Sequence, residues 1–242
     1  MSRLAINGGV PVRSGKKFPA WPSPCEGQSE ALREVLDSGV WGITSVAIAE
    51  FERTFAAYQQ AKYGIAMCNG SVTLRNALLA CGVEGGDEVI VPPYTFLATV
   101  TSVIEANCVP VFVDIDPGTY CMNPAEIEAK ITARTRVIVP VHIGGNPADM
   151  DRITAIARKH DLRVIEDAAH AVGAEYKHRR VGSIGDFGSF SFQSSKNLCS
   201  GEGGMIVAND DHLAERCWSV HNCGRIRTGA WYSHPNLGGN YR

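Results

Sequence analysis

The sequence predicts an α/β fold in which a parallel β-sheet is covered by helices on both faces. Between about residues 60 and 220, short apolar runs rich in β-branched residues alternate with stretches that have helical spacing. This alternation is typical of strands joined by crossover helices, which pack on both faces of the sheet. Hydrophobic residues make up 45% and charged residues 20% of the 242-residue chain, which suffices for a sizeable buried core.

Each element is expected from a local pattern in the chain. Residues 1–24 are rich in Gly and Pro and predict an extended N-terminal arm, and residues 25–242 predict one large domain. Two helices are expected first, over 27–38 and 46–60, from apolar side chains at helical spacing. Strands are predicted at Glu88–Pro92, Val109–Ile115, Arg136–His142, Arg163–Asp167, Gly188–Gln193 and Met205–Ala208, and further helices at Val72–Cys81, Leu97–Ala106, Pro124–Ile131, Asp149–His160 and His212–Val220.

Charge and composition argue against several classes of protein. The 23 basic and 25 acidic side chains give a net charge of −2, which offers no basic surface for nucleic acid. No apolar run reaches the roughly 18 residues of a membrane span. The N-terminus lacks the pattern of a signal peptide, and the eight cysteines form no C-x-x-C pair or zinc-like cluster. We therefore expect a cytoplasmic protein with reduced thiols and no metal site.

A possible anion site precedes one of the predicted helices. In Asn69-Gly70-Ser71, the glycine allows the backbone to approach an anion closely, and Ser71 is expected to cap the helix. The free N–H groups of such a helix end favour a phosphate. The same tripeptide also fits a plain helix cap, and neither a G-x-G-x-x-G nor a G-x-x-x-x-G-K-[ST] motif is present to support a nucleotide site.

Two further groups follow predicted strands, where open α/β sheets bind their ligands. Asp167 ends an apolar strand and is followed by His170; a carboxylate at this place can hold a cationic ring nitrogen. Lys196 follows a β-rich run and precedes Gly201-Glu202-Gly203-Gly204, and a partly enclosed lysine can lose its proton and condense with an aldehyde. Taken singly, these residues also fit a solvated strand end, a core histidine and a surface lysine.

Together, a phosphate site, a strand-end acid and an enclosed lysine supply what pyridoxal 5′-phosphate needs. The lysine carries the aldehyde, and the acid keeps the pyridine nitrogen protonated so that the ring can accept electrons. Pro93-Tyr94-Thr95-Phe96 adds aromatic rings at another strand end, where one can stack on the cofactor or simply pack in the core. The residues alone leave the reaction and the substrate open.

In these motifs the sequence resembles the DegT/StrS-type sugar aminotransferases, which are fold type I pyridoxal-phosphate enzymes. The resemblance extends from Phe18-Pro19-Ala20-Trp21-Pro22 to the last residue. Its motifs are Asn69-Gly70-Ser71, Glu88-Val89-Ile90-Val91-Pro92 with Thr95-Phe96, Val139-Pro140-Val141-His142, Glu166-Asp167-Ala168-Ala169-His170, and Ser189-Phe190-Ser191-Phe192-Gln193 leading to Lys196 and Gly201-Glu202-Gly203-Gly204. It implies a three-layer sandwich with a mostly parallel, mixed central sheet, the large cofactor-binding domain of that fold.

The resemblance also implies a role for each matching residue. Lys196 would bind the cofactor aldehyde and move protons, Asp167 would pair with the pyridine nitrogen, and His170 would lie near the ring or its oxygen. Phe96, rather than Tyr94, would stack on the ring. The phosphate would be held by Gly70, Ser71 and Ser191, and by Asn240 from the neighbouring subunit of a homodimer with shared active sites.

The implied activity is transfer of an amino group from glutamate or glutamine to a keto-sugar nucleotide or a keto-cyclitol. Such reactions belong to the biosynthesis of amino sugars and aminocyclitols for antibiotics or cell-surface polysaccharides. The Phe-Pro-Ala-Trp-Pro segment resembles the cyclitol and aminohydroxybenzoate branch of the family, which favours a cyclitol ketone. Ser71 stands where threonine is more usual, and the chain ends within the Asn-Tyr-Arg motif, before the smaller C-terminal domain of the family. The alternative interpretation is therefore a non-catalytic or regulatory truncated homologue on the same scaffold.

Overall fold

The computed structural model describes residues 3–227, 234 and 238–239, and its core is a seven-stranded mixed sheet. The strand order is β1-β9-β8-β5-β4-β2-β3. The strands are β1 (Tyr63–Met67), β2 (Glu88–Val91), β3 (Val109–Phe112), β4 (Thr135–Ile138), β5 (Arg163–Asp167), β8 (Phe187–Ser191) and β9 (Gly204–Ala208). Strands β3, β2, β4, β5 and β8 run parallel, whereas β9 pairs antiparallel with both β8 and β1. The predicted fold class, an α/β sandwich with a mostly parallel mixed sheet, is confirmed.

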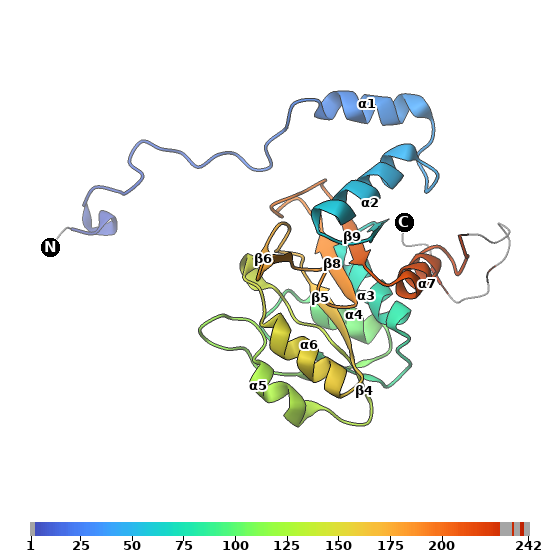
Figure 1. Cartoon of the computed structure of the whole chain (residues 1–242). Helices are drawn as coiled ribbons and strands as arrows, with labels where there is room; N and C mark the ends of the chain where they lie inside the picture. Colours follow the sequence, from blue (N-terminus) through green and yellow to red (C-terminus); the bar gives the residue numbers. More distant parts are fainter. Residues whose placement is uncertain (1–2, 228–233, 235–237, 240–242) are drawn as a thin grey trace.

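Helices cover both faces of this sheet and make the outer two layers (Figure 1). One face carries α3 (Gly70–Cys81), α4 (Ala98–Glu105) and α7 (Asp211–His221), and the other carries α2 (Val46–Tyr58), α5 (Pro124–Ile127) and α6 (Met150–Lys159). Consecutive residues of a strand point to opposite faces. In β2, for example, Val89 and Val91 join the core beneath α3 while Ile90 joins the core beneath α6. This burial on both faces explains why the strands are apolar throughout.

Strand β1 was not expected from the sequence. The segment Tyr63–Met67 is short and contains glycine and alanine, which weaken the signal of a strand. The structure explains Gly64: a β-carbon there would lie 2.4 Å from the backbone oxygen of Glu52 in α2. The close approach of α2 therefore requires glycine at position 64, and this glycine weakens the strand pattern of β1 in the sequence. A short hairpin of β6 (Glu175–Tyr176) and β7 (Arg179–Arg180) was also not predicted.

The N-terminal segment extends away from the three layers (Figure 1). It contains a short 3-10 turn at Ala5–Asn7 and is largely exposed, and the following helix α1 (Gln28–Ser38) has no buried residue. A hydrogen bond connects this segment to the loop after β8: the indole N–H of Trp21 donates to the carbonyl oxygen of Ser194 at 3.0 Å. Among the described residues, no helix combines the length and apolar character that a membrane crossing requires.

Candidate active site

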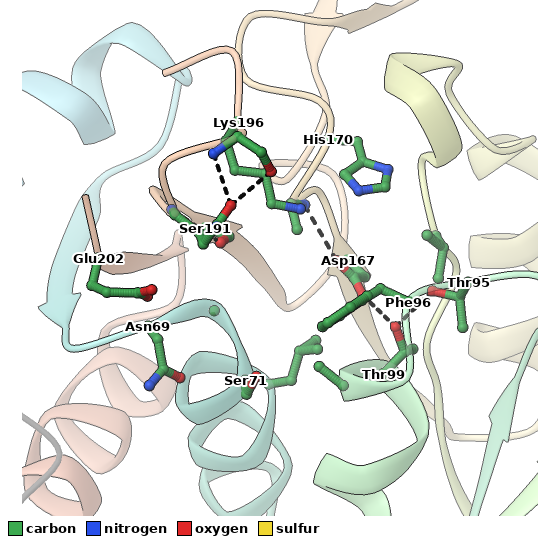
Figure 2. A pocket seen from close by; sticks show the side chains of 17 residues that line it. Asn69, Ser71, Thr95, Phe96, Thr99, Asp167, His170, Ser191, Lys196 and Glu202 are labelled. Carbon is green, nitrogen blue, oxygen red and sulfur yellow. Dashed lines mark hydrogen bonds between the residues drawn. The ribbon is translucent and has the colours of Figure 1, made fainter. Parts of the chain in front are cut away.

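The predicted site residues gather around one cavity of about 510 Å³ at the carboxyl ends of the parallel strands (Figure 2). Open α/β sheets bind ligands at this edge. The side of the cavity nearest α3 is formed by that helix's N-terminal half, and the others by the first turn of α4 and by the segments at or after the ends of β2, β4, β5 and β8. The predicted residues that line the cavity are Gly70, Ser71, Phe96, Asp167, His170, Ser191 and Lys196. Asn240 lies outside the described residues.

The N-terminus of α3 faces the cavity, but its cap differs from the predicted one. The side chain of Asn69 accepts the N–H of Val72 at 2.9 Å and is the N-cap, so the prediction that Ser71 caps the helix is wrong. Asparagine takes this place because its side-chain oxygen reaches the third N–H of the helix. Ser71 instead lies in the first turn and is free to face the cavity, beside backbone N–H groups that have no partner within a helix.

Gly70 brings α3 and the end of β8 into close approach. A β-carbon at position 70 would lie 2.7 Å from the β-carbon and 3.2 Å from the hydroxyl oxygen of Ser191. The N-terminus of a helix and a serine hydroxyl group thus meet at one point of the cavity wall. This combination suits a phosphate, because the helix end carries partial positive charge and both groups can donate hydrogen bonds.

Asp167 ends β5 and is held by its backbone and its side chain. Its N–H donates to the oxygen of Pro140 at 2.9 Å, and its own carbonyl oxygen accepts the N–H of His142 at 3.0 Å. The side-chain oxygen Oδ2 accepts the hydroxyl of Thr99 at 2.7 Å, and Oδ1 accepts the N–H of Ala169 at 3.2 Å. Only 5% of Asp167 is exposed. The sheet edge therefore presents a fixed carboxylate to the cavity.

Lys196 lies in the loop after β8 and lines the cavity. The sequence predicted a partly enclosed lysine at this place. Burial lowers the pKa of the Lys196 amine, and the nearby negative charge of Asp167 opposes this effect. A lowered pKa leaves more of the amine neutral at a given pH, and the neutral amine is the form that attacks an aldehyde.

His170 lies beside this amine and accepts a backbone hydrogen bond. Burial lowers the pKa of its imidazole, and the positive charge of Lys196 lowers it further. The Nδ1 atom of the ring accepts the N–H of Gly144 at 3.3 Å, so in the neutral ring Nε2 carries the hydrogen. His170 therefore offers one N–H donor next to a lysine that is more readily neutral than usual.

Aromatic residues after β2 take different positions. Phe96 lines the cavity with its ring largely exposed, which suits the predicted stacking on a flat ligand. Tyr94 packs beside Tyr120, with ring centroids 5.7 Å apart. Phe96 is thus the better placed of the two, as expected.

Sequence reasoning missed several residues of the site. Thr95, Thr99, Gln193 and Glu202 also line the cavity, and Thr99 bonds directly to Asp167. The one available signal was the four-residue spacing of Thr95, which precedes α4, and Thr99, which lies in its first turn; their hydroxyl oxygens are 2.7 Å apart. That spacing is common, and the aspartate it serves lies 68 residues away in the chain.

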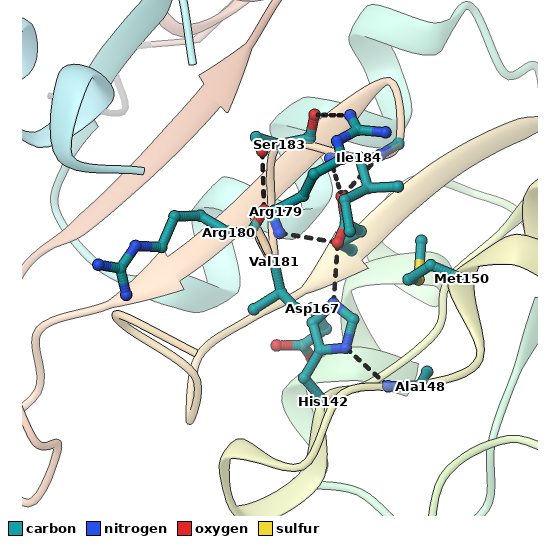
Figure 3. Close-up of polar contacts among 12 residues, drawn as sticks. His142, Ala148, Met150, Asp167, Arg179, Arg180, Val181, Ser183 and Ile184 are labelled. Atoms are coloured by element: carbon teal, nitrogen blue, oxygen red, sulfur yellow. Dashed lines mark hydrogen bonds and ion pairs between the residues drawn. The ribbon is translucent and has the colours of Figure 1, made fainter. Parts of the chain in front are cut away.

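Next to Asp167, the side chain of Glu166 is fully buried and makes a separate polar network. Two of its partners, His142 and Ile184, are labelled in Figure 3. Successive residues of a strand point to opposite faces, so Glu166 lies on the other face of β5. Its oxygen Oε2 accepts from Gly182 N–H at 2.7 Å and contacts His142 Nε2 at 2.9 Å, and Oε1 accepts from Ile184 and Gly185 at 2.7 and 2.6 Å.

The ring of His142 is oriented by a second bond. Its Nδ1 atom accepts the N–H of Ala148 at 3.1 Å, so the hydrogen is on Nε2 and is donated to Glu166. The carboxylate of Glu166 thus has four donors and joins the ends of β4 and β5 to the loop before β8.

Comparisons with known proteins agree with this fold. The chain is 47% identical over 234 residues to L-glutamine:2-deoxy-scyllo-inosose aminotransferase from Micromonospora echinospora, which covers 94% of this chain and 56% of that protein. The structure superimposes on that of 3-amino-5-hydroxybenzoic acid synthase with a TM-score of 0.90 and 38% identity, over 93% of this chain and 60% of the other. The first of these relatives is named for a cyclitol and the second for aminohydroxybenzoic acid.

A third similar protein was solved with a cofactor. NtdA from Bacillus subtilis, described with bound cofactor PMP, has a TM-score of 0.81 and 34% identity over 88% of this chain and 48% of that chain. The chain spans about half the length of the curated relatives it matches. Residues 24–242 match the DegT/DnrJ/EryC1/StrS aminotransferase family, and the chain belongs to that family.

Proposed function

We propose that the chain is the cofactor-binding part of a pyridoxal-phosphate-dependent aminotransferase that moves an amino group from L-glutamine to a keto-cyclitol. The observation that carries the proposal is that Lys196, Asp167 and the N-terminus of α3 open into one cavity. The relative from Micromonospora echinospora, named for L-glutamine and 2-deoxy-scyllo-inosose, supports this donor and this class of acceptor. We place the reaction in the biosynthesis of aminocyclitols, as in antibiotics, in preference to cell-surface polysaccharides.

The residues present fit pyridoxal 5′-phosphate. Gly70 lets the N-terminus of α3 approach Ser191 so closely that a β-carbon at position 70 would lie 2.7 Å from that of Ser191, and the N–H groups of this helix end suit a phosphate. Asp167 supplies a fixed acceptor for a protonated ring nitrogen, and Lys196 supplies an amine whose pKa is lowered by burial. The cavity of about 510 Å³ is within the usual range for a small-molecule site. When bound, this cofactor supplies an aldehyde and a ring that accepts electrons from a carbon next to nitrogen.

Each residue of the site would then have its own role in the reaction. Gly70, Ser71 and Ser191 would hold the phosphate, and Phe96 would cover one face of the ring. Asp167 holds a proton at the ring nitrogen by a charge-assisted hydrogen bond. Lys196 would take the proton from the α-carbon of the donor as a general base, and would then deliver it, as a general acid, to the carbon that was the aldehyde carbon of the cofactor. His170 offers its Nε2–H to an oxygen atom in the same cavity.

Isotope transfer tests the proposed reaction. The chain is loaded with pyridoxal 5′-phosphate and given L-glutamine labelled with ¹⁵N at the α-amino group, together with 2-deoxy-scyllo-inosose. We expect mass spectrometry to find ¹⁵N in an aminated cyclitol, and little product when labelled L-alanine replaces glutamine. A cofactor that binds at Lys196 without any labelled product would contradict the proposed transfer and favour a binding protein on this scaffold.

The Gly70→Ala variant tests the phosphate site. The new methyl group would meet Ser191 at less than a normal contact distance, so one wall of the site must move. We expect the affinity for pyridoxal 5′-phosphate to fall about 10-fold or more, because a displaced helix end loses hydrogen bonds to a charged group. Gly85→Ala is the matched control, since a β-carbon there meets only Asn107 at an ordinary 3.9 Å. Equal affinities of the two variants would rule out phosphate binding at Gly70.

The homodimer with shared sites also remains a proposal. It is supported by the family resemblance of the Asn240-Tyr241-Arg242 segment, which lies outside the described residues. Sedimentation of the cofactor-loaded chain at several concentrations tests it directly; a monomer at all concentrations would contradict it.

A further inference from the structure

Thr99 directs its hydroxyl group to the carboxylate of Asp167 (Figure 2). The two oxygens are 2.7 Å apart, and the two residues are only 1% and 5% exposed. An ionised carboxylate has no hydrogen to donate, so Thr99 is the donor. The hydroxyl of Thr95 lies 2.7 Å behind that of Thr99. Because the hydrogen of Thr99 is already engaged, Thr95 donates to Thr99, and the two hydroxyls form a one-way chain that ends on Asp167.

The backbone on both sides keeps this chain in place. The N–H of Thr99 donates to the oxygen of Phe96 at 3.1 Å, and its carbonyl oxygen accepts the hydroxyl of Ser102 at 3.1 Å. The other oxygen of Asp167 accepts the N–H of Ala169. With one donor on each oxygen, any rotation of the carboxylate breaks a hydrogen bond in a place where little water is available to replace it.

We propose that Thr99 is a positioning residue for the cofactor, acting through Asp167. It keeps the carboxylate oriented toward the cavity before the cofactor arrives, so that binding a protonated ring nitrogen requires no rearrangement. Without the hydroxyl group, one oxygen of the nearly buried carboxylate loses its donor and the carboxylate turns in the cofactor-free protein, so binding must reverse that rotation. This inference rests on the proposed function, because it takes the ring nitrogen to be the partner of Asp167.

The test compares two probes that differ only at the ring nitrogen: pyridoxal 5′-phosphate and its 1-deaza analogue, in which carbon replaces that nitrogen. For each variant, the dissociation constants of both probes are measured, and their ratio gives the preference for nitrogen. We expect the intact chain to prefer pyridoxal 5′-phosphate and Thr99→Val to lower this preference about 10-fold, the usual effect of losing a hydrogen bond to a charged group. Thr99→Ser, which keeps the hydroxyl, should restore it.

Controls separate this effect from general damage. Thr101→Val makes the same change at a half-buried position of the same helix and should leave the preference unchanged. A merely structural defect in Thr99→Val would weaken both probes equally and leave the ratio intact, which would overturn the inference. Asp167→Asn should remove the preference, showing that the ratio reports on this carboxylate. Failure of the unmodified chain to bind either probe would instead overturn the proposed function, and the inference with it.

Discussion

Replacing Lys196 with alanine should lower amino transfer about 10³-fold or more, because the variant loses the group that exchanges protons with the donor's α-carbon. It should also lose covalent attachment of the cofactor: after borohydride reduction and digestion, the native chain should carry the cofactor on the peptide with Lys196, and the variant should carry none. Lys196→Arg provides a stricter comparison. Arginine keeps the positive charge but does not give up its proton, so it should be as inactive as alanine.

Lys177→Ala is the matched control for Lys196. Lys177 is exposed and does not line the cavity, and its amine forms an ion pair with Asp151. Its removal should leave both the rate and the labelled peptide unchanged. A cofactor label on another lysine of the native chain, or unchanged turnover in Lys196→Ala, would show that Lys196 is not the attachment site.

The Glu166→Gln variant should lower the free energy of unfolding by about 3 kcal/mol, since a buried donor left without an acceptor costs about 1–3 kcal/mol. The side chain keeps its shape, but its new amide N–H₂ faces either the N–H groups of Ile184 and Gly185 or those of Gly182 and His142. Either orientation places donors against donors in a region from which water is excluded.

Urea unfolding measures this loss, with Glu175→Gln as the matched control. Glu175 is exposed and lies 3.5 Å from Arg180, and such surface pairs contribute less than about 1 kcal/mol. If Glu166→Gln destabilised the chain no more than Glu175→Gln does, the four-donor network would not be a source of stability. Because Glu166 adjoins Asp167, we also expect the variant to bind pyridoxal 5′-phosphate more weakly.

Local patterns predicted the parts of the fold in which one signal dominates. Arg163–Asp167 is a strand with the predicted bounds, because an apolar run that ends in two acids allows few other structures at the edge of a sheet. The helix expected from Val72 begins at Gly70 instead, since Asn69 outcompetes Ser71 as the cap. Strand β1 was missed because Gly64, which α2 requires, is a weak strand former.

The candidate site divides in the same way. Asp167 and Lys196 could be identified because each combines an uncommon position with chemistry that a single cofactor needs. Thr99 could not, because a threonine in the first turn of a helix is ordinary, and only the folded chain shows the carboxylate that it serves. Glu166 and His142 appeared in two separate sequence motifs, but their pairing could not be predicted. The other donors to Glu166 come from a loop with no distinctive sequence.

The hydrogen bond between Trp21 and Ser194 changes how the N-terminal arm should be treated in the laboratory. By composition, the arm looks like a tail that can be trimmed or tagged at will. Its indole N–H, however, donates a hydrogen bond to the backbone two residues before Lys196. Trimming the arm would thus remove a hydrogen bond from the loop that carries Lys196.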